Sequence, residues 1–393
     1  MAERAILVTV SGPDRVGVGA ELWSALGRLG DRGRLSDVAQ ITIRGYLVLC
    51  AEVTVASDVT VDDVRAAIAT QPIETDGITA TVTETTHDAG ADGRRLLVTL
   101  LAPTISATQL DAVFSTFASH GATCERIVHL AQYPVDCYEL VVRGVDHDAL
   151  RDDLTLVAPS IGLDLAVQRA GLHRRAKHLV VMDADSTLLQ DEVIDLLADA
   201  CGCADEVAVV TRAAMAGEID FAEALRRRVA LLAGLEASVL DDVRARLRLA
   251  PGARTLLTTL ARLGYVPAVV SGGFVEVLAP LLADLGVSLF AANRLEVDDG
   301  RLTGRLVGEV LDRAGKARAL HRFADEVGVP LAQTVAVGDG ANDIDMLAAA
   351  GLGVAFNAKP LVRAHADTAL SVPYLDAVLY LLGISREEIE AQG

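Results

Sequence analysis

Residues 179–190, LVVMDADSTLLQ, decide the fold of the second half of this 393-residue chain. The run begins with four apolar residues, which is typical of a buried strand in a parallel sheet. Asp183 and Asp185 follow at alternate positions, and Ser186 and Thr187 come next. Burying two acids at the end of a strand is unfavourable, so they indicate either a bound cation or a reaction that uses them. On this stretch alone, a polar turn in which Thr187 caps a helix explains the residues about as well.

A second apolar run with a polar end lies at residues 266–270, directly before Ser271 and Gly272. A hydroxyl and an exposed backbone amide at this position suit a phosphate oxygen. Lys316 stands near the start of a predicted helix, where a cation opposes the helix dipole. A lysine that neutralises a phosphoryl group would offset that cost, although an ordinary surface lysine is the commoner case.

A third apolar run, residues 334–337, leads into GDGAND, which contains Asp339, Asn342 and Asp343. A turn rich in glycine, asparagine and aspartate explains this segment by itself. The carboxyl ends of parallel strands are, however, where open α/β sheets bind ligands. Three strand ends with matching polar residues therefore indicate one shared site.

Together these segments resemble the four motifs of the haloacid-dehalogenase (HAD) superfamily of phosphohydrolases: D-x-D-S-T, a serine, a lysine and GDGxND. The resemblance covers residues 178–393 and implies an α/β fold, a HAD-like Rossmannoid parallel sheet with a helical lid (cap) inserted after the first strand, at about residues 192–250. It further implies Mg²⁺, held by Asp183, Asp339 and the backbone carbonyl of Asp185. The site residues that it implies are the nucleophile Asp183, the general acid and base Asp185, the phosphoryl-binding residues Lys316, Ser271, Gly272 and Asn342, and the supporting residues Thr187 and Asp343.

The resemblance extends to the phosphoserine phosphatases. Gln190-Asp191-Glu192 follows the nucleophile, as in that family, and the predicted lid carries Met215, Phe221 and Arg228 in one helical run. The family resemblance implies O-phospho-L-serine as substrate, with Glu192 facing its ammonium group and Arg228 binding its carboxylate. Met215 and Phe221 would exclude water when the lid closes. Without the resemblance, these charges would be interpreted as a solvated helix face.

The first half of the chain contains one supersecondary unit twice. Strand and helix patterns occur in the order βαββαβ over residues 4–84 and again over residues 95–168, with a polar joint at residues 87–93. Both copies resemble ACT domains, the ferredoxin-like modules that sense amino acids on metabolic enzymes. We expect ACT domains at residues 1–86 and 94–170 and the HAD domain at residues 178–393, after a basic linker at residues 171–177.

Only the first ACT copy has a glycine-bearing loop between its first strand and first helix. That loop is GPDRVG and includes Asp14 and Gly17, whereas the second copy has APTISATQ. Glycine lets the backbone approach a ligand closely. The resemblance implies an amino-acid effector, for which we expect L-serine, near Asp14 and Gly17, and a homodimer formed through the ACT domains. A dimerisation module without any ligand is the competing interpretation.

Composition excludes several classes of protein. The formal net charge of −19 opposes binding to nucleic acid or to an anionic membrane. No apolar run is long enough for a membrane span, and the N-terminus lacks the pattern of a signal peptide, so we expect a cytoplasmic protein. Five scattered cysteines do not form a disulfide pattern, so we expect free thiols in a reducing compartment.

Two other functions stay open at this point. One is a related phosphatase or phosphotransferase that acts on another small phosphate, such as phosphohomoserine. The other is an amino-acid sensor whose phosphatase domain is vestigial, although Asp183, Asp185, Lys316 and Asp339 are all present.

Overall fold

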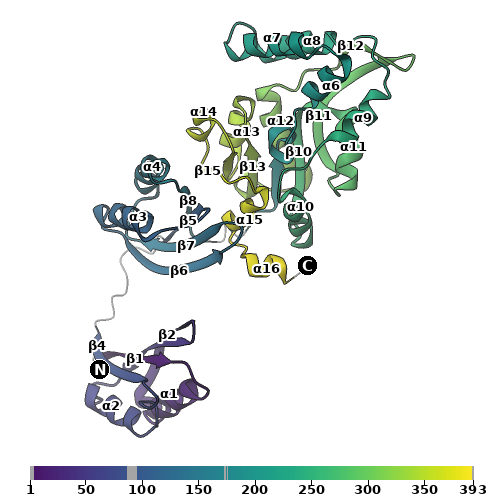
Figure 1. Ribbon diagram of the computed structural model, residues 1–393. Coiled ribbons are helices and arrows are strands. Elements are labelled where there is room, and N and C mark those ends of the chain that lie inside the picture. Colours follow the sequence, from purple (N-terminus) through teal and green to yellow (C-terminus); the bar gives the residue numbers. More distant parts are fainter. Residues whose placement is uncertain (1–3, 86–94, 172–173, 175, 392–393) are drawn as a thin grey trace. The chain divides into compact units, whose positions relative to one another are not determined.

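The computed structural model describes residues 4–85, 95–171, 174 and 176–391 (Figure 1). These residues form two compact units, Met1–Ala91 and Asp92–Gly393, which are described separately below. The predicted polar joint at residues 87–93 lies outside the described residues, so the predicted domain boundaries stay predictions. None of the described helices is long and apolar enough to cross a lipid bilayer.

The first unit is one antiparallel sheet with two helices packed against it. The strand order is β2-β3-β1-β4, and alternate residues of β1, among them Ile6, Val8 and Val10, point into the core. Thr60 caps the second helix, and its backbone amide donates to the Asp63 carboxylate, which completes a capping box. The elements are β1 (Arg4–Pro13), α1 (Val18–Gly27), η1 (Gly30–Arg32), β2 (Gly33–Ile43), β3 (Tyr46–Val55), α2 (Val61–Ala69) and β4 (Thr79–Thr85).

The second unit begins with the same βαββαβ arrangement. Its sheet has the corresponding order β6-β7-β5-β8, which confirms the predicted repeat of a ferredoxin-like fold. The elements are β5 (Arg95–Ala102), α3 (Ala107–Ser119), β6 (Thr123–Ala131), β7 (Asp136–Arg143), α4 (His147–Val157), η2 (Ala158–Ile161) and β8 (Asp164–Arg169).

A seven-stranded sheet follows, in the order β12-β11-β10-β9-β13-β14-β15. The strand β9 (Leu179–Met182) is central, pairs in parallel with β10 and β13, and is fully buried. Its residues alternate between the two faces, with Leu179 and Val181 in one core cluster and Val180 and Met182 in the other. The other strands are β10 (Val266–Phe274), β11 (Leu289–Asp298), the antiparallel β12 (Arg301–Val307), β13 (Thr334–Gly338), β14 (Gly353–Phe356) and β15 (Thr368–Leu370).

Helices cover both faces of this sheet. The clusters place α12 and α13 on one face, and α6, α10 and α11 on the other. The elements are α10 (Ala253–Arg262), α11 (Val275–Asp284), α12 (Arg313–Val327), η4 (Leu331–Gln333), η5 (Ala341–Asp343), α13 (Ile344–Ala349), α14 (Pro360–Arg363), η6 (Leu375–Ala377), α15 (Val378–Leu381) and α16 (Arg386–Glu390). The prediction of an α/β fold with a parallel sheet is confirmed.

Four helices lie between β9 and α10, in the region predicted as a lid. They are α6 (Val193–Cys201), α7 (Ala204–Met215), α8 (Phe221–Ala230) and α9 (Val239–Arg246), after the short η3 (Ala184–Leu188). Figure 1 shows α7 and α8 beside each other, and α8 contacts β12, the edge strand of the seven-stranded sheet. Within this region Cys201 and Cys203 form a disulfide, so the prediction that all five cysteines are free thiols is wrong for this pair.

The second ACT-like sheet and the seven-stranded sheet share a hydrophobic core. Leu101, Cys137 and Ala166 belong to the same cluster as residues of the parallel sheet. The strand β8 contacts β15, and the Thr368 hydroxyl donates to the Leu165 carbonyl oxygen at 2.8 Å. Because β8 packs against this second partner, it is buried at all but one of its residues.

The predicted basic linker is partly buried. The Arg174 guanidinium forms an ion pair with Glu139 of β7, and both side chains are more than 90% buried. The Lys177 ammonium donates to the carbonyl oxygens of Ala332 and Thr334. Arg174 therefore attaches the linker to the ACT-like sheet, and Lys177 attaches it to the seven-stranded sheet. Neither side chain points into solvent.

Candidate active site

The polar ends of three neighbouring strands meet at one edge of the parallel sheet. Asp183 follows β9, Ser271 and Gly272 lie in the last part of β10, and Asp339 follows β13. Because β9 lies between β10 and β13, these side chains come from adjacent strand ends, as the sequence predicts.

Lys316 is the cation at the centre of this edge. It lies in the first turn of α12, is fully buried, and places its Nζ 2.6 Å from Asp183 Oδ2 and 2.7 Å from Asp343 Oδ1. Burial alone lowers the pKa of Lys316, but Asp183 and Asp343 raise it above its usual value. The ammonium group is therefore held charged between two carboxylates.

Asp343 packs closely against the glycine that ends β13. Its Oδ2 accepts from the Gly340 amide at 2.9 Å, and a Cβ atom on Gly338 would lie 2.5 Å from its carboxyl carbon. The glycines of GDGAND thus make room for a carboxylate that reaches back to Lys316.

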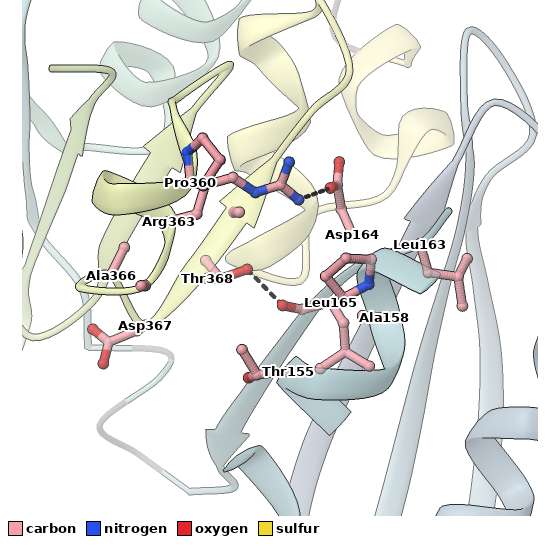
Figure 2. Close-up of a pocket in the computed structure, with 13 residues that line it drawn as sticks. Thr155, Ala158, Leu163, Asp164, Leu165, Pro360, Arg363, Ala366, Asp367 and Thr368 are labelled. Carbon is pink, nitrogen blue, oxygen red and sulfur yellow. Dashed lines mark hydrogen bonds and ion pairs between the residues drawn. The ribbon is translucent and has the colours of Figure 1, made fainter. Parts of the chain in front are cut away.

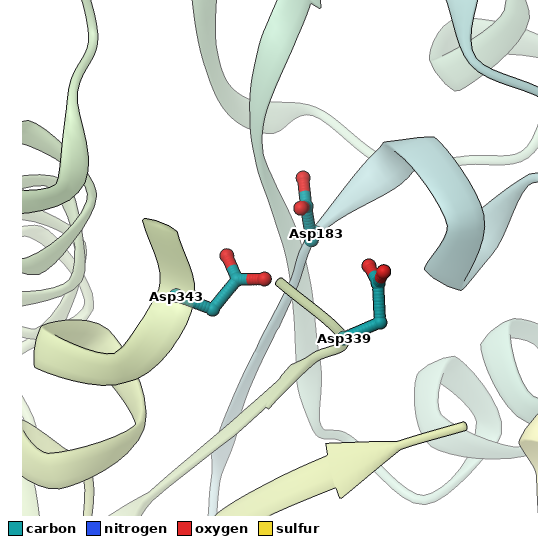
Figure 3. Close-up of side chains that lie close together, drawn as sticks. All are labelled: Asp183, Asp339 and Asp343. Atoms are coloured by element: carbon teal, nitrogen blue, oxygen red, sulfur yellow. The ribbon is translucent and has the colours of Figure 1, made fainter. Parts of the chain in front are cut away.

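Three carboxylates converge next to Lys316, and Figure 3 shows Asp183, Asp339 and Asp343 around a common point. One oxygen from each lies within 4.8 Å of the others. Thr187 donates its hydroxyl to Asp339 Oδ1 at 3.1 Å. An all-oxygen set of this kind is suited to a hard divalent cation.

The electrostatics of these carboxylates support the same conclusion. Burial and the charge of Asp343 raise the pKa of Asp183, against the opposing effect of Lys316. Burial and Asp343 likewise raise the pKa of Asp339 to about 6. One lysine therefore leaves negative charge uncompensated, and a bound cation would relieve it.

Asp185 points away from this cluster. Its Oδ1 accepts from the Val193 amide at 2.9 Å, and its Oδ2 accepts from the Ser271 hydroxyl at 3.1 Å. Burial raises the pKa of Asp185. Burial thus favours the protonated form of this carboxyl group, which a general acid requires, although the two hydrogen bonds oppose it.

The lid contributes one wall of a small cavity above these groups. Glu192, Phe221 and Arg228 line it, together with Asp183 and Asp185. Gly272 and Asn342 line it as well. Its volume of about 50 Å³ is enough for a few water molecules only. A larger ligand therefore requires the helices to move apart.

Opposite charges face each other in this cavity. Burial lowers the pKa of Arg228, whereas Glu192, Asp195 and Asp185 raise it. Burial and the charge of Asp185 raise the pKa of Glu192 to about 7. Burial therefore disfavours the charged form of each of these two side chains.

Ser186 belongs to the D-x-D-S-T motif, but the motif assigns it no contact. Its φ of 56° lies in the left-handed region, and its hydroxyl donates to Glu192 Oε1 at 2.8 Å. A strained residue at a turn of this kind is found at functional sites. No pattern of residue types reveals a left-handed serine, so only the structure could identify this contact.

Three further predicted residues are not among those that line this cavity in the described part of the structure. Met215 ends α7, but its side chain lies outside the part that the structure describes. Asp14 and Gly17 belong to the first unit, where Gly17 has φ of 100° and directly precedes α1. The Thr42 hydroxyl donates to Asp14 Oδ2 at 3.4 Å.

Comparisons with known proteins agree with this geometry. A family model described as haloacid dehalogenase-like hydrolase matches residues 180–348, and an ACT domain model matches residues 95–168. A phosphoserine phosphatase of Streptomyces coelicolor is 53% identical over 387 residues, which are 98% of this chain and 94% of the relative. One from Mycobacterium tuberculosis is 47% identical over 402 residues, 99% of this chain and 96% of the relative.

A solved structure shares the arrangement of the fold. The crystal structure of a probable phosphoserine phosphatase from Vibrio cholerae, in unliganded form, is 32% identical, covers 75% of this chain and 88% of its own, and has a TM-score of 0.58. The fold and the strand-end site define a haloacid dehalogenase-like hydrolase that carries an ACT domain. Since its relatives match over nearly their whole length, the chain belongs to the phosphoserine phosphatase family.

The burial of Glu192 predicts a stabilising substitution. Its pKa is raised from 4.5 to about 7 in the folded protein, so ionisation costs stability as the pH rises from about 4.5 to 7. In metal-free protein, Glu192→Gln should leave stability unchanged at pH 4 and raise it by at most about 3 kcal/mol above pH 7. Urea unfolding of both proteins across this pH range measures the difference.

Glu218→Gln is the matched control, because Glu218 is exposed in the same group of helices. It should have no pH-dependent effect. If the unfolding free energy of Glu192→Gln equals that of wild type at every pH, burial does not raise the pKa of Glu192.

Proposed function

We propose that this protein is a Mg²⁺-dependent phosphoserine phosphatase, which hydrolyses O-phospho-L-serine to L-serine and phosphate through a phosphoaspartyl intermediate on Asp183. The observation that carries the proposal is the position of Lys316 between Asp183 and Asp343 at the end of β9. The full-length relatives named phosphoserine phosphatase support the choice of substrate.

Asp183 is the nucleophile in this proposal. The Ala184 amide donates to its Oδ1 at 2.7 Å, and Lys316 contacts its Oδ2, so the carboxylate has a fixed orientation. The nucleophilic form is the ionised carboxylate, which the adjacent Lys316 ammonium favours against the effect of burial on the pKa of Asp183. One oxygen attacks phosphorus, the bond from phosphorus to the serine oxygen breaks, and Asp183 becomes an acyl phosphate.

Asp185 is the general acid and the general base in this proposal. In its protonated form it donates to the departing serine oxygen, and in its ionised form it then accepts a proton from the water that attacks the acyl phosphate. The Val193 amide and the Ser271 hydroxyl hold it in place for both steps. Its raised pKa favours the protonated form that the first step needs.

The phosphoryl group would be held by donors from three elements. Lys316, the Ser271 hydroxyl, the Gly272 amide and Asn342 provide them, and Asp343 keeps Lys316 in place. Phosphoryl transfer depends mainly on positioning and on the neutralisation of spreading charge. Buried donors are effective for this purpose because they do not have to reorganise during the reaction.

The metal in the proposal is Mg²⁺. Asp183, Asp339 and the backbone carbonyl of Asp185 would bind it, and Thr187 and Asp343 would orient the acidic side chains. When bound, the ion supplies positive charge that lets an anionic nucleophile approach an anionic phosphate.

Recognition of the serine part rests on the lid. Glu192 would pair with the substrate ammonium group and Arg228 with its carboxylate, while Phe221 and Met215 would exclude water. The small volume of the cavity implies that the lid opens to admit substrate and closes around it.

Regulation is assigned to the ACT domains. We place an amino-acid effector, L-serine, near Asp14 and Gly17, where Gly17 adopts a positive φ directly before α1. Pairing of ACT sheets between two chains would give a homodimer. Feedback by L-serine would link the product of the reaction to its rate.

Phosphate release from a panel of small phosphates tests this proposal. With Mg²⁺, O-phospho-L-serine should be hydrolysed with a kcat/KM at least about tenfold above those of phosphothreonine and phosphohomoserine. A chelator should abolish activity, and free L-serine should change the rate in the full-length protein. Higher activity on phosphohomoserine would identify the alternative substrate, and no turnover of any phosphate would identify a vestigial domain.

Selectivity should depend on Arg228. Truncating one partner of a buried charge pair costs about 2–5 kcal/mol, so Arg228→Ala should lower kcat/KM for phosphoserine by about 30-fold to several thousandfold. A phosphate ester without a carboxylate, p-nitrophenyl phosphate, should be affected far less. Arg228→Lys should restore activity only in part, because lysine lacks the planar fork.

Arg226→Ala provides the matched control, since Arg226 is exposed on the same helix. It should leave both substrates unaffected. Equal losses on both substrates in Arg228→Ala would show that Arg228 serves lid closure and that the amino-acid head is recognised by other residues.

A further inference from the structure

A cavity of about 300 Å³ lies between the second ACT-like sheet and the parallel sheet, well removed in sequence from the strand ends of the active site. Figure 2 shows that one wall comes from α4, η2 and β8, and the other from α14 and β15. Both walls belong to the second compact unit and are joined by the hydrogen bond from Thr368 to the Leu165 carbonyl. The catalytic mechanism uses none of these residues.

Most of the cavity wall is apolar. Ala158, Leu163 and Leu165 contribute side chains from the ACT side, and Pro360 and Ala366 contribute them from the phosphatase side. Such a wall favours a ligand with a compact hydrocarbon body, because apolar contact there displaces water.

Two opposite charges stand together on the same cavity. Asp164 is 5% exposed, and its Oδ2 accepts from the Ser371 amide. The Arg363 guanidinium lies 3.6 Å from its Oδ1, which is too long for a direct hydrogen bond. The Ser371 side chain and the Val372 amide also donate to the Asp164 carboxylate and fix its position. The long contact leaves the Arg363 guanidinium, which is 32% exposed, able to pair with a carboxylate, and leaves the charge of Asp164 facing the cavity for an ammonium group.

We infer that this cavity is a regulatory site for a small zwitterion with an apolar body, whose ammonium group pairs with Asp164 and whose carboxylate pairs with Arg363. A ligand with only one of these charges would leave either Asp164 or Arg363 without a new partner. This site is separate from the effector site proposed near Asp14 and Gly17, and it does not depend on the identity of the substrate.

The wall of the cavity that carries Arg363 is connected to the active site through packed elements. The helix α14 (Pro360–Arg363) packs against η5 (Ala341–Asp343), which ends with Asp343. Asp343 in turn accepts a hydrogen bond from Lys316 at 2.7 Å. A ligand that changes the position of α14 therefore acts on the element that orients the catalytic lysine, and by linkage, binding at either site affects the other.

Titration calorimetry on the full-length protein tests the site with three probes that share one hydrocarbon body. L-Leucine has both charges, 4-methylpentanoate lacks the ammonium group, and 3-methylbutylamine lacks the carboxylate. L-Leucine should bind at least about tenfold more tightly than either analogue. Excess L-serine, added to occupy the first ACT domain, should leave this binding in place.

Ala366→Phe fills the cavity and should abolish leucine binding while phosphatase activity without leucine stays unchanged. Ala245→Phe is the control for the added ring, because Ala245 is exposed on α9 and does not line the cavity. Leucine should also change the KM for the phosphatase substrate in wild type and not in Ala366→Phe. Equal affinity for all three probes, leucine binding that survives in Ala366→Phe, or binding without any change in KM would each overturn the inference.

If the protein does not hydrolyse phosphoserine, the calorimetric result still decides whether the cavity binds a zwitterion. The KM measurement then uses whichever phosphate in the panel is turned over. Failure of the proposed function and failure of this inference are therefore distinguishable.

Discussion

The buried ammonium group of Lys316 is the interaction on which the site depends. It contacts Asp183, which directly follows β9, and Asp343, which ends η5, and all three side chains are buried, so solvent does not screen their charges. Removing Lys316 would leave two carboxylates close together in a buried site, which is unfavourable. Burying these charges is unfavourable for the folded protein by itself. The same charges can bind a phosphoryl group and a cation, so the site is organised for the charge of its ligands.

A second constraint is the shared core between the second ACT-like sheet and the phosphatase sheet. The strand β8 is buried on one side by its own helices and on the other by β15, and the Arg174–Glu139 ion pair and Gln168 add polar contacts across this junction. An ACT domain that packs in this way cannot move as an independent unit. It is therefore placed to affect the parallel sheet directly, through β15 and the helix α14 beside it.

Much of this architecture could be predicted from the sequence because its signals are local. The apolar run LVVM predicts a buried strand, and the structure places it at the centre of the sheet. The glycines of GDGAND have a steric reason, since Asp343 occupies the space beside Gly338. Other features could not be predicted. The left-handed conformation of Ser186 is a backbone angle, and no pattern of residue types reveals it. The burial of Arg174 and the Asp164–Arg363 pair depend on elements that are distant in sequence. The pairing of Cys201 and Cys203 was missed because composition indicated free thiols.

The central claim is that Asp183 becomes covalently phosphorylated during turnover. The direct measurement is to quench the reaction with O-phosphoserine, reduce the protein with borohydride, which converts an aspartyl phosphate to homoserine, and sequence the peptides by mass spectrometry. We expect homoserine at position 183 and at no other aspartate, and only when substrate is present. Homoserine at Asp185 or Asp339, or an unmodified Asp183 in protein that is quenched during steady turnover, would contradict it.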